Sequence, residues 1–396
     1  MDRLQQSTEN GLGLNLYVDG RFGSFSTNRL DKKELETLIT NGIESTRYLA
    51  VDESRMLADP ARYYKGGKPD LQLFDKKLYE VNPDDKVAIA RAAAEEVLGK
   101  DERIISVDSS YSDGEGSSYR LISNGFEGES KSTWFSVSAS VSIKGEGEAR
   151  PQDYWYDSAL FYDKLTKTGI GAKALERVLR KLGQKKAKSG KYTMVVDPMN
   201  VGNLLSPMLS ALYGSALQQK NSFLMDKLDA KVASDLFTLR DEPHVIGANG
   251  SRYFDNEGVA TEPRTVFDKG VLKTYFIDTY NGKKMNMAPT ISTPSRLILV
   301  PGDKDLNGLV ADVKQGILVT GFNGGNSNSS TGDFSYGIEG FLIEDGKLTQ
   351  PVNEMNVTGN MVALWNSLVA VGNDPQPNRS WQIPSLVFEG VDFSGL

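Results

Sequence analysis

The chain of 396 residues carries 52 Asp and Glu against 45 Lys and Arg, a net charge of -7 that argues against nucleic acid as a partner. Its 39% hydrophobic and 24% charged residues exclude a disordered or fibrous protein, and the length predicts two or three domains. It has no cysteine and one histidine, His244, so a zinc site of the usual His and Cys ligands cannot form within it. Carboxylates alone would suit Mg or Ca better.

The N-terminal half alternates strands with amphipathic helices. Residues 12–18 and 21–25 flank Asp19-Gly20, a pattern that predicts a β-hairpin. Apolar residues at helical spacing predict three helices, over 31–50, 83–98 and 171–182. Three β-rich runs predict successive strands of an antiparallel sheet, over 103–108, 118–123 and 132–143. Between the first two runs, Asp113-Gly114-Glu115-Gly116 is interpreted as a hairpin turn.

The polar stretch 183–191 predicts the boundary between an N-terminal domain, residues 1–188, and a C-terminal domain, residues 189–396. Seven basic residues gather around it: Arg177, Arg180, Lys181, Lys185, Lys186, Lys188 and Lys191. We interpret them as a solvated helix end, with cations near the C-terminus of the helix dipole, rather than as a nucleic-acid patch.

Beyond residue 190 the pattern changes to many short strands separated by Gly, Asn and Asp turns. Turns at 268–270 and 344–347 indicate hairpins, and 321–332 is interpreted as a mobile loop rich in Gly, Asn and Ser. One helix is predicted over 204–218, with Pro207 in its first turn. The predicted fold class is therefore α+β: an N-terminal antiparallel sheet with helices, and a C-terminal β-rich domain of barrel or sandwich type.

No run of about 18 apolar residues is present, and the polar N-terminus lacks the apolar segment of a signal peptide, so we expect a cytoplasmic protein without a membrane span. No G-x-S-x-G motif accompanies the single histidine, which argues against a serine hydrolase.

Several long segments carry a resemblance to a known family. They are GLGLNLYVDGRFGSFSTNRL, PMNVGNLLSPMLSALYGSALQQKNSFL, DEPHVIGANGSRYFDNEGVATEPRTVFDKGVL, TGFNGGNSNSSTGDFSYGIEGFLIEDGKLTQPV and MNVTGNM. On these segments and their order, which cover most of the chain, it resembles the TldD/PmbA family, also called modulators of DNA gyrase. Relatives usually carry a further helix and strand before the opening segment, so we expect such an N-terminal segment to be missing here.

The resemblance implies a site that has lost its metal ligands. Zinc-bearing TldD members carry a His-Glu pair and a second His on a helix, with a Cys near the C-terminus. Here Ser206-Pro207 stands at the His-Glu pair, Ser210-Ala211 at the second His, and 371–374 at the Cys. The general base is lost with the ligands, because a Glu beside metal-bound water performs that role. The chain thus resembles the PmbA (TldE) kind, with no cofactor of its own and zinc expected in a TldD-like partner.

Two further places are candidates for peptide contact. Asp333, Phe334, Ser335 and Tyr336 leave the 321–332 loop and enter a strand; they form either the edge of a peptide cleft or a core strand, two interpretations that the sequence leaves open. His244 enters a strand, and we interpret it as a structural residue or a peptide contact rather than a metal ligand.

Two functions remain. The resemblance implies a zinc-free subunit of a TldD/PmbA-type metallopeptidase complex that acts on unfolded peptides, non-catalytic alone and contributing partner binding and cleft formation. The alternative is a homodimeric regulatory protein, a modulator of DNA gyrase without catalysis.

Overall fold

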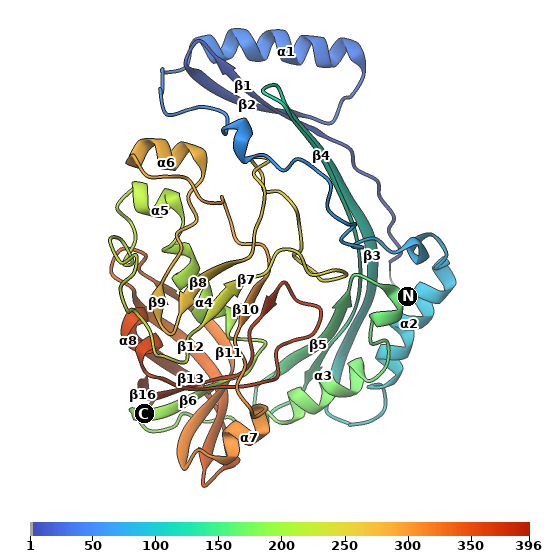
Figure 1. Ribbon diagram of the computed structural model, residues 1–396. Helices are drawn as coiled ribbons and strands as arrows, with labels where there is room; N and C mark the ends of the chain where they lie inside the picture. Colours follow the sequence, from blue (N-terminus) through green and yellow to red (C-terminus); the bar gives the residue numbers. More distant parts are fainter. Residues whose placement is uncertain (1–2) are drawn as a thin grey trace.

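The computed structural model describes residues 3–396. A long curved wall of strands with two helices on its outer side stands beside a β-rich body, and a small layer of one helix and one hairpin lies above both (Figure 1). The wall and the body have separate hydrophobic cores. The predicted α+β class with a β-rich C-terminal part is confirmed.

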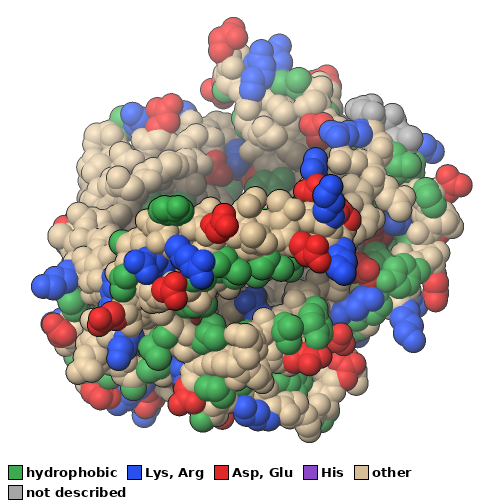
Figure 2. Space-filling view, turned by 90° about the horizontal axis from the view of Figure 1, so that it is seen from above, with side chains coloured by type: hydrophobic (Ala, Val, Ile, Leu, Met, Phe, Trp, Pro, Cys, Tyr) green, Lys and Arg blue, Asp and Glu red, His purple; other side chains and the backbone are tan. Residues whose placement is uncertain are grey.

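The upper layer consists of β1 (Leu12–Val18), β2 (Arg21–Thr27) and α1 (Lys32–Arg47). The predicted hairpin is confirmed: Asp19 and Gly20 adopt φ of 50° and 74°, the left-handed conformation that a tight two-residue turn requires. The carboxylate of Asp31 accepts a hydrogen bond from the Glu34 amide at 3.1 Å, which fixes the start of α1. Seen from above, charged side chains of both signs are interspersed and the surface is hollowed beside this layer (Figure 2).

The wall is a three-stranded antiparallel sheet of β3 (Ile104–Ile122), β4 (Phe126–Ile143) and β5 (Gln152–Ala159). The predicted break within β3 is wrong: 103–108 and 118–123 belong to one strand, and residues 113–116 lie in its middle. A Cβ at Gly114 would come 2.9 Å from the Trp134 ring. The glycine therefore makes room for a cross-strand indole rather than forming a turn.

Helices α2 (Pro83–Glu95) and α3 (Ile170–Leu179) confirm two predicted helices and pack on this sheet. The alternate residues of β4 that point inward are fully buried against them, namely Phe135, Val137, Ala139, Val141 and Ile143. This alternation is the half-buried strand pattern that the sequence displays.

The body contains eleven further strands within residues 3–396. They are β6 (Gly190–Val196), β7 (Leu239–Asp241), β8 (Arg264–Asp268), β9 (Val271–Leu272), β10 (Leu297–Leu299), β11 (Gln315–Ser327), β12 (Asp333–Glu344), β13 (Lys347–Asn360), β14 (Leu368–Val371), β15 (Trp381–Gln382) and β16 (Leu386–Ser394). In one sheet the order β13-β12-β11-β6-β16 closes on itself, since β13 also pairs with β16; β14 extends it beyond β16. The closed sheet is a barrel, which is one of the two types that the sequence left open. A second sheet has the order β15-β10-β7-β8-β9.

Five helices complete the body: α4 (Gly202–Ser210), α5 (Gly214–Gln218), α6 (Thr279–Met285), α7 (Leu306–Ala311) and α8 (Met361–Asn366). The single helix predicted over 204–218 is wrong. Tyr213 is extended, with φ of -73° and ψ of 140°, and separates α4 from α5. Because α4 begins at Gly202, Pro207 lies in its second turn and not its first. The predicted loop over 321–332 is shorter, because β11 continues to Ser327.

Part of the basic cluster near residue 183 is buried between wall and body, contrary to the prediction of a solvated helix end. Lys181 is 8% exposed, and its Nζ lies 2.7 Å from Glu339 Oε1 and 3.2 Å from Asp153 Oδ2. Arg177 Nε also reaches Asp153, at 3.2 Å. These ion pairs join β5 and α3 to strand β12 of the barrel. Within residues 3–396, no helix is long and apolar enough to cross a membrane.

Candidate functional site

Helix α4 presents one polar face to solvent, and its local sequence dictates which face. Leu204, Leu205, Met208 and Leu209 are buried in the core of the body, so residues 203, 206 and 210 at helical spacing face outward. The carboxylate of Asp197 fixes the entry into the helix, because it accepts hydrogen bonds from the backbone amide and side-chain Nδ2 of Asn200. Asn200 Nδ2 also donates to the Thr320 carbonyl on β11, at 2.8 Å. The helix is thereby anchored to the barrel.

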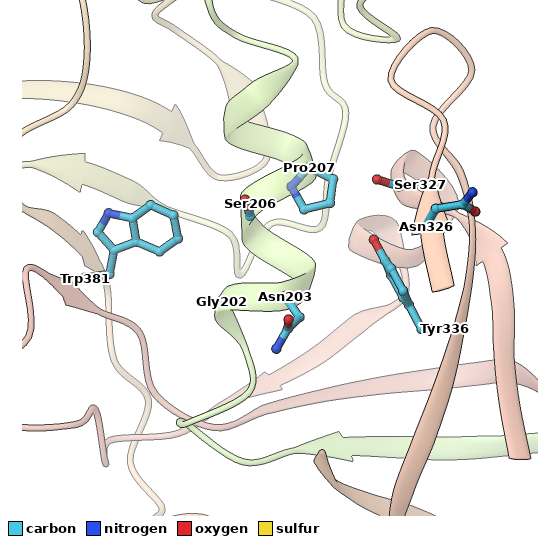
Figure 3. A pocket seen from close by; sticks show the side chains of 8 residues that line it. All are labelled: Gly202, Asn203, Ser206, Pro207, Asn326, Ser327, Tyr336 and Trp381. Atoms are coloured by element: carbon cyan, nitrogen blue, oxygen red, sulfur yellow. The ribbon is translucent and has the colours of Figure 1, made fainter. Parts of the chain in front are cut away.

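A cavity of about 540 Å³ lies against this face. It is lined by Gly202, Asn203, Ser206, Pro207, Asn326, Ser327, Tyr336 and Trp381. Figure 3 shows Ser206 and Pro207 on α4, with the Trp381 indole on one side and Tyr336, Asn326 and Ser327 on the other. Three parts of the body build this cavity: a helix, the β11–β12 hairpin and the edge strand β15.

The positions inferred to have lost metal ligands separate into two pairs. Ser206 and Pro207 line the cavity. Ser210 is exposed but does not line the cavity. Ala211 is 1% exposed, and its carbonyl oxygen accepts a hydrogen bond from the Ser222 hydroxyl at 2.6 Å. The structure therefore brings the first pair to the site and turns Ala211 into the core.

The chemistry of the lining is polar and uncharged. It offers hydroxyl groups, side-chain amides and two aromatic rings, and none of its eight residues is His, Asp, Glu, Lys or Arg. Such groups can donate and accept hydrogen bonds, but they cannot hold zinc in the His, Cys and carboxylate environment that this metal takes. Across residues 3–396, no group of three or more His, Asp or Glu side chains is placed to hold a metal ion. The residues present do not fit a zinc site.

Residues 333–336 divide between core and cavity. β12 is paired on both sides, with β11 and with β13, so the interpretation of this segment as a strand edge open to an added peptide is wrong. Phe334 is 5% exposed and belongs to the core, as the core-strand interpretation predicts, whereas Asp333 and Ser335 are exposed outside the cavity lining. Hydrogen bonds from Asn360 and Thr331 lower the pKa of Asp333 and hold it in the hairpin turn.

Tyr336 is the residue of this segment that reaches the cavity. Its ring lies 5.4 Å from the Phe334 ring and 5.6 Å from the Phe322 ring, centroid to centroid. These contacts hold the Tyr336 ring in place before a ligand binds. A ligand that packs on the ring therefore does not have to order it, which lowers the entropic cost of binding.

His244 lies away from the cavity, after the end of β7. Its Nε2 is 3.0 Å from the Thr261 hydroxyl, and that hydroxyl donates its own hydrogen to the Arg252 carbonyl at 2.5 Å. The Thr261 oxygen is therefore the acceptor, and His244 is the donor. Burial lowers the pKa of His244. Of the two roles predicted for His244, the structure supports the structural one.

Sequence reasoning missed five lining residues: Gly202, Asn203, Asn326, Ser327 and Trp381. The exposed face of α4 could have been found from the spacing of Asn203 and Ser206 around buried leucines. Trp381 gives no such signal, because it lies on a two-residue strand that pairs in parallel with β10 through Leu297. Its neighbours at the site are about 50 and 170 positions away in the chain, so only the fold brings them together.

Comparison with known proteins decides the family. Residues 189–395 match the model of the PmbA/TldA metallopeptidase C-terminal domain, and residues 76–182 match that of the PmbA/TldA metallopeptidase central domain. The chain belongs to the PmbA/TldD family. It is 28% identical to the metalloprotease PmbA homolog of Haemophilus influenzae over 400 residues, which cover 100% of this chain and 88% of the relative. The metalloprotease PmbA of Escherichia coli O157:H7 is 26% identical, at 100% and 88% coverage.

Solved structures agree with the fold. A Bacteroides thetaiotaomicron protein named as a modulator of DNA gyrase has a TM-score of 0.99 and 73% identity, covering 100% of this chain and 91% of that one. TldE from Thermococcus kodakarensis has a TM-score of 0.81 at 21% identity, covering 97% and 89%. At that identity the likeness to TldE concerns the fold alone.

Proposed function

We propose that this chain is the zinc-free subunit of a TldD/PmbA-type metallopeptidase complex, which binds a TldD-like zinc-bearing partner and helps to hold unfolded peptides for cleavage. The observation that carries the proposal is the cavity against α4. It lies where the family resemblance expects a metal-binding helix, and Ser206 and Pro207 there provide neither ligand nor general base. The family membership supplies the peptidase context.

The composition of the cavity supports a peptide as its ligand. An extended peptide backbone presents alternating N–H and C=O groups, which hydroxyl and amide side chains can satisfy irrespective of peptide sequence. Tyr336 and Trp381 provide flat apolar surfaces for side chains of the peptide. An uncharged lining of this kind suits a broad range of unfolded segments rather than one charged substrate.

The test is reconstitution with a TldD-like subunit from the same source. The mixture is expected to contain a complex, detected by size-exclusion chromatography with light scattering. It is also expected to contain zinc and to cleave a casein-derived peptide pool. This chain alone is expected to contain no zinc and to cleave no peptide. Ser206→Trp, which fills the cavity, is expected to leave complex formation intact and to slow cleavage at least tenfold. Ser215→Trp on α5, an exposed serine outside the cavity, is the matched control and is expected to cleave normally.

The alternative of a homodimeric modulator of DNA gyrase follows from the name of the Bacteroides relative. A homodimer that fails to bind the TldD-like subunit but changes the supercoiling rate of purified gyrase would favour this alternative.

The cavity's role has its own refuting outcome. Equal cleavage by the Ser206→Trp and Ser215→Trp complexes would show that the cavity does not bind peptides.

A further inference from the structure

The wall of strands has a second face, opposite α2 and α3, that turns toward the body (Figure 1). It consists of every second residue of β3 from 106 to 118, of β4 from 130 to 142 and of β5 from 152 to 158, and cross-strand partners such as Ser110 and Ser138 share it. None of its residues is buried. We call it the serine face, because serine occupies most of these positions.

The serine face offers hydroxyl groups and almost no charge, since Asp108 is its single charged residue. Ser110 Oγ lies 2.8 Å from Ser138 Oγ, and Gln152 Nε2 donates to Ser140 Oγ at 2.8 Å, so these groups are held in place. A hydroxyl has one donor and two acceptor positions, so each retains hydrogen-bonding capacity for a ligand. The backbone of β4 is paired with β3 and with β5, which leaves the side chains as the groups that a ligand can reach.

Three aromatic residues interrupt the serines. Trp134 is 46% exposed, and its ring lies against Gly114 on the neighbouring strand. Tyr154 is 51% exposed, and its ring centroid lies 6.0 Å from that of Tyr156. Tyrosine and tryptophan supply rigid contact area and serine supplies adaptable hydrogen bonds, a combination by which antibody loops bind varied protein ligands. The composition indicates a binding surface.

Charge and size decide which ligand the serine face suits. With one carboxylate and no cation among its positions, it lacks the Lys and Arg that nucleic acid phosphates require. Strands rise about 3.4 Å per residue and lie about 4.8 Å apart, so the face measures roughly 40 Å by roughly 14 Å. The resulting area, roughly 560 Å², is below the about 800 Å² that each partner buries in a stable complex of folded proteins. An extended peptide of about 12 residues spans about 40 Å and fits the face.

The repeat of the face also matches an extended peptide. Every second side chain of an extended chain points the same way, at a repeat of about 6.8 Å. Positions on one strand of the serine face recur at that interval, and the Tyr154 and Tyr156 ring centroids are 6.0 Å apart. Successive side chains of a peptide that runs along β4 and β5 therefore meet successive positions of the face.

The serine face meets the cavity against α4 at one short segment. The guanidinium carbon of Arg379 lies 4.7 Å from the Tyr156 ring centroid, and Trp381, two residues further on, lines the cavity. The Arg379 carbonyl accepts hydrogen bonds from Gln382 Nε2 at 2.7 Å and from Arg296 Nη1 at 2.8 Å, which fix this segment. Residues 379–381 therefore connect the two surfaces.

We propose that the serine face is a docking surface for an extended, unfolded polypeptide, which it holds before the polypeptide enters the cavity. Its hydroxyls pair with backbone N–H and C=O groups irrespective of peptide sequence, and its aromatic rings pack on apolar side chains of the peptide. Entry into the cavity rests on the proposed function, whereas binding to the face requires this chain alone.

The test is fluorescence anisotropy of a fluorescein-labelled peptide of about 12 residues, composed of Gly, Ser, Ala, Leu and Pro, titrated with the isolated full chain. Tyr154→Ser and Trp134→Ala each remove exposed aromatic surface from the serine face. Tyr119→Ala is the matched control, because Tyr119 is 62% exposed on β3 but lies on the opposite face of the sheet, in register with Glu129. Maltoheptaose is added as a competitor to test whether the rings bind a sugar chain instead.

The wild type and Tyr119→Ala are expected to bind the peptide with equal dissociation constants, and Tyr154→Ser and Trp134→Ala with constants at least fivefold higher. Equal constants for all four proteins would overturn the inference. So would an absence of binding by the wild type, or displacement of the peptide by maltoheptaose. If Trp134→Ala does not fold, Tyr154→Ser decides the matter.

The cavity variant Ser206→Trp separates this inference from the proposed function, because it leaves the serine face intact. It is expected to slow cleavage by the reconstituted complex while the isolated chain keeps the dissociation constant of the wild type. Slow cleavage by Ser206→Trp together with unchanged binding by Tyr154→Ser would refute the inference alone. Weakened binding by Tyr154→Ser together with normal cleavage by Ser206→Trp would support the docking surface and refute the proposed role of the cavity.

Discussion

Replacing Lys181 by methionine tests the ion cluster that joins the wall of strands to the barrel. Its Nζ contacts Glu339 and Asp153 and donates to the Gln152 carbonyl at 2.9 Å. Methionine keeps most of the length and apolar volume of the side chain and removes only the charge. The variant therefore isolates the electrostatic contribution of one buried cation.

The expected loss is large, because two carboxylates are left behind. The side chains of Asp153 and Glu339 are 6% and 17% exposed. Breaking a buried ion pair by removing one partner costs about 3–5 kcal/mol. Asp153 retains Arg177, so the lower end of that range applies, and we expect the free energy of unfolding to fall by about 3 kcal/mol.

The assay is urea denaturation followed by tryptophan fluorescence. The ring centroid of Trp155 on β5 lies 5.5 Å from the guanidinium carbon of Arg177, so its fluorescence reports on the contact between the wall and the barrel. Lys231→Met is the control, since Lys231 pairs with Asp235 on the surface, where both side chains are largely exposed. The control midpoint is expected to be unchanged.

A double variant makes the reasoning refutable. Lys181→Met combined with Glu339→Leu leaves one buried carboxylate fewer without its cation, so it should lose less stability than Lys181→Met alone. A loss below about 1 kcal/mol in the single variant, or a double variant equal to the sum of the two single ones, would show that the cluster is not electrostatically coupled.

Three other predictions concern the barrel and α4. A Cβ at Gly340 would lie 1.8 Å from the Leu318 carbonyl oxygen. Gly340→Ala should therefore lower the free energy of unfolding, measured by urea denaturation, by about 2 kcal/mol or more. Gly116→Ala is the control and should not lower it, because a Cβ at Gly116 would have no atom within 4 Å. Burial raises the pKa of Asp197 from 3.8 to about 6, so the folded state binds the proton more tightly than the unfolded state does. The free energy of unfolding should therefore fall as the pH rises from about 4 to 6, by on the order of 3 kcal/mol. Asp197→Asn should flatten this pH profile, and an unchanged slope in the variant would contradict the prediction. Pro207→Ala restores an amide inside α4 and should raise the melting temperature; a lower one would mean that the proline ring packs better than the structure indicates.

The sequence predicted elements where local chemistry dominates. The Asp19-Gly20 hairpin, the Asp31 cap and the amphipathic α2 and α3 depend on neighbours a few residues away, and all are present. Prediction failed at glycines whose role is set by distant side chains. Gly114 has the composition of a turn, but Trp134 on the neighbouring strand explains it. A local pattern cannot distinguish these two uses of glycine.

The site was predicted in part for the same reason. Ser206 and Pro207 were identified through the family resemblance, and Tyr336 as a candidate for peptide contact; the structure places all three around one cavity. Asp333, Ser335 and His244 were candidates that the structure places elsewhere.

The most direct test of the central claim is to measure zinc content and peptide cleavage for the purified chain, alone and mixed with a TldD-like subunit from the same source. We expect zinc and cleavage only in the mixture, with cleavage reduced when Ser206→Trp replaces the wild type. Stoichiometric zinc together with cleavage by this chain alone would contradict the account, because neither the cavity against α4 nor any group of His, Asp and Glu within residues 3–396 offers a site for that metal.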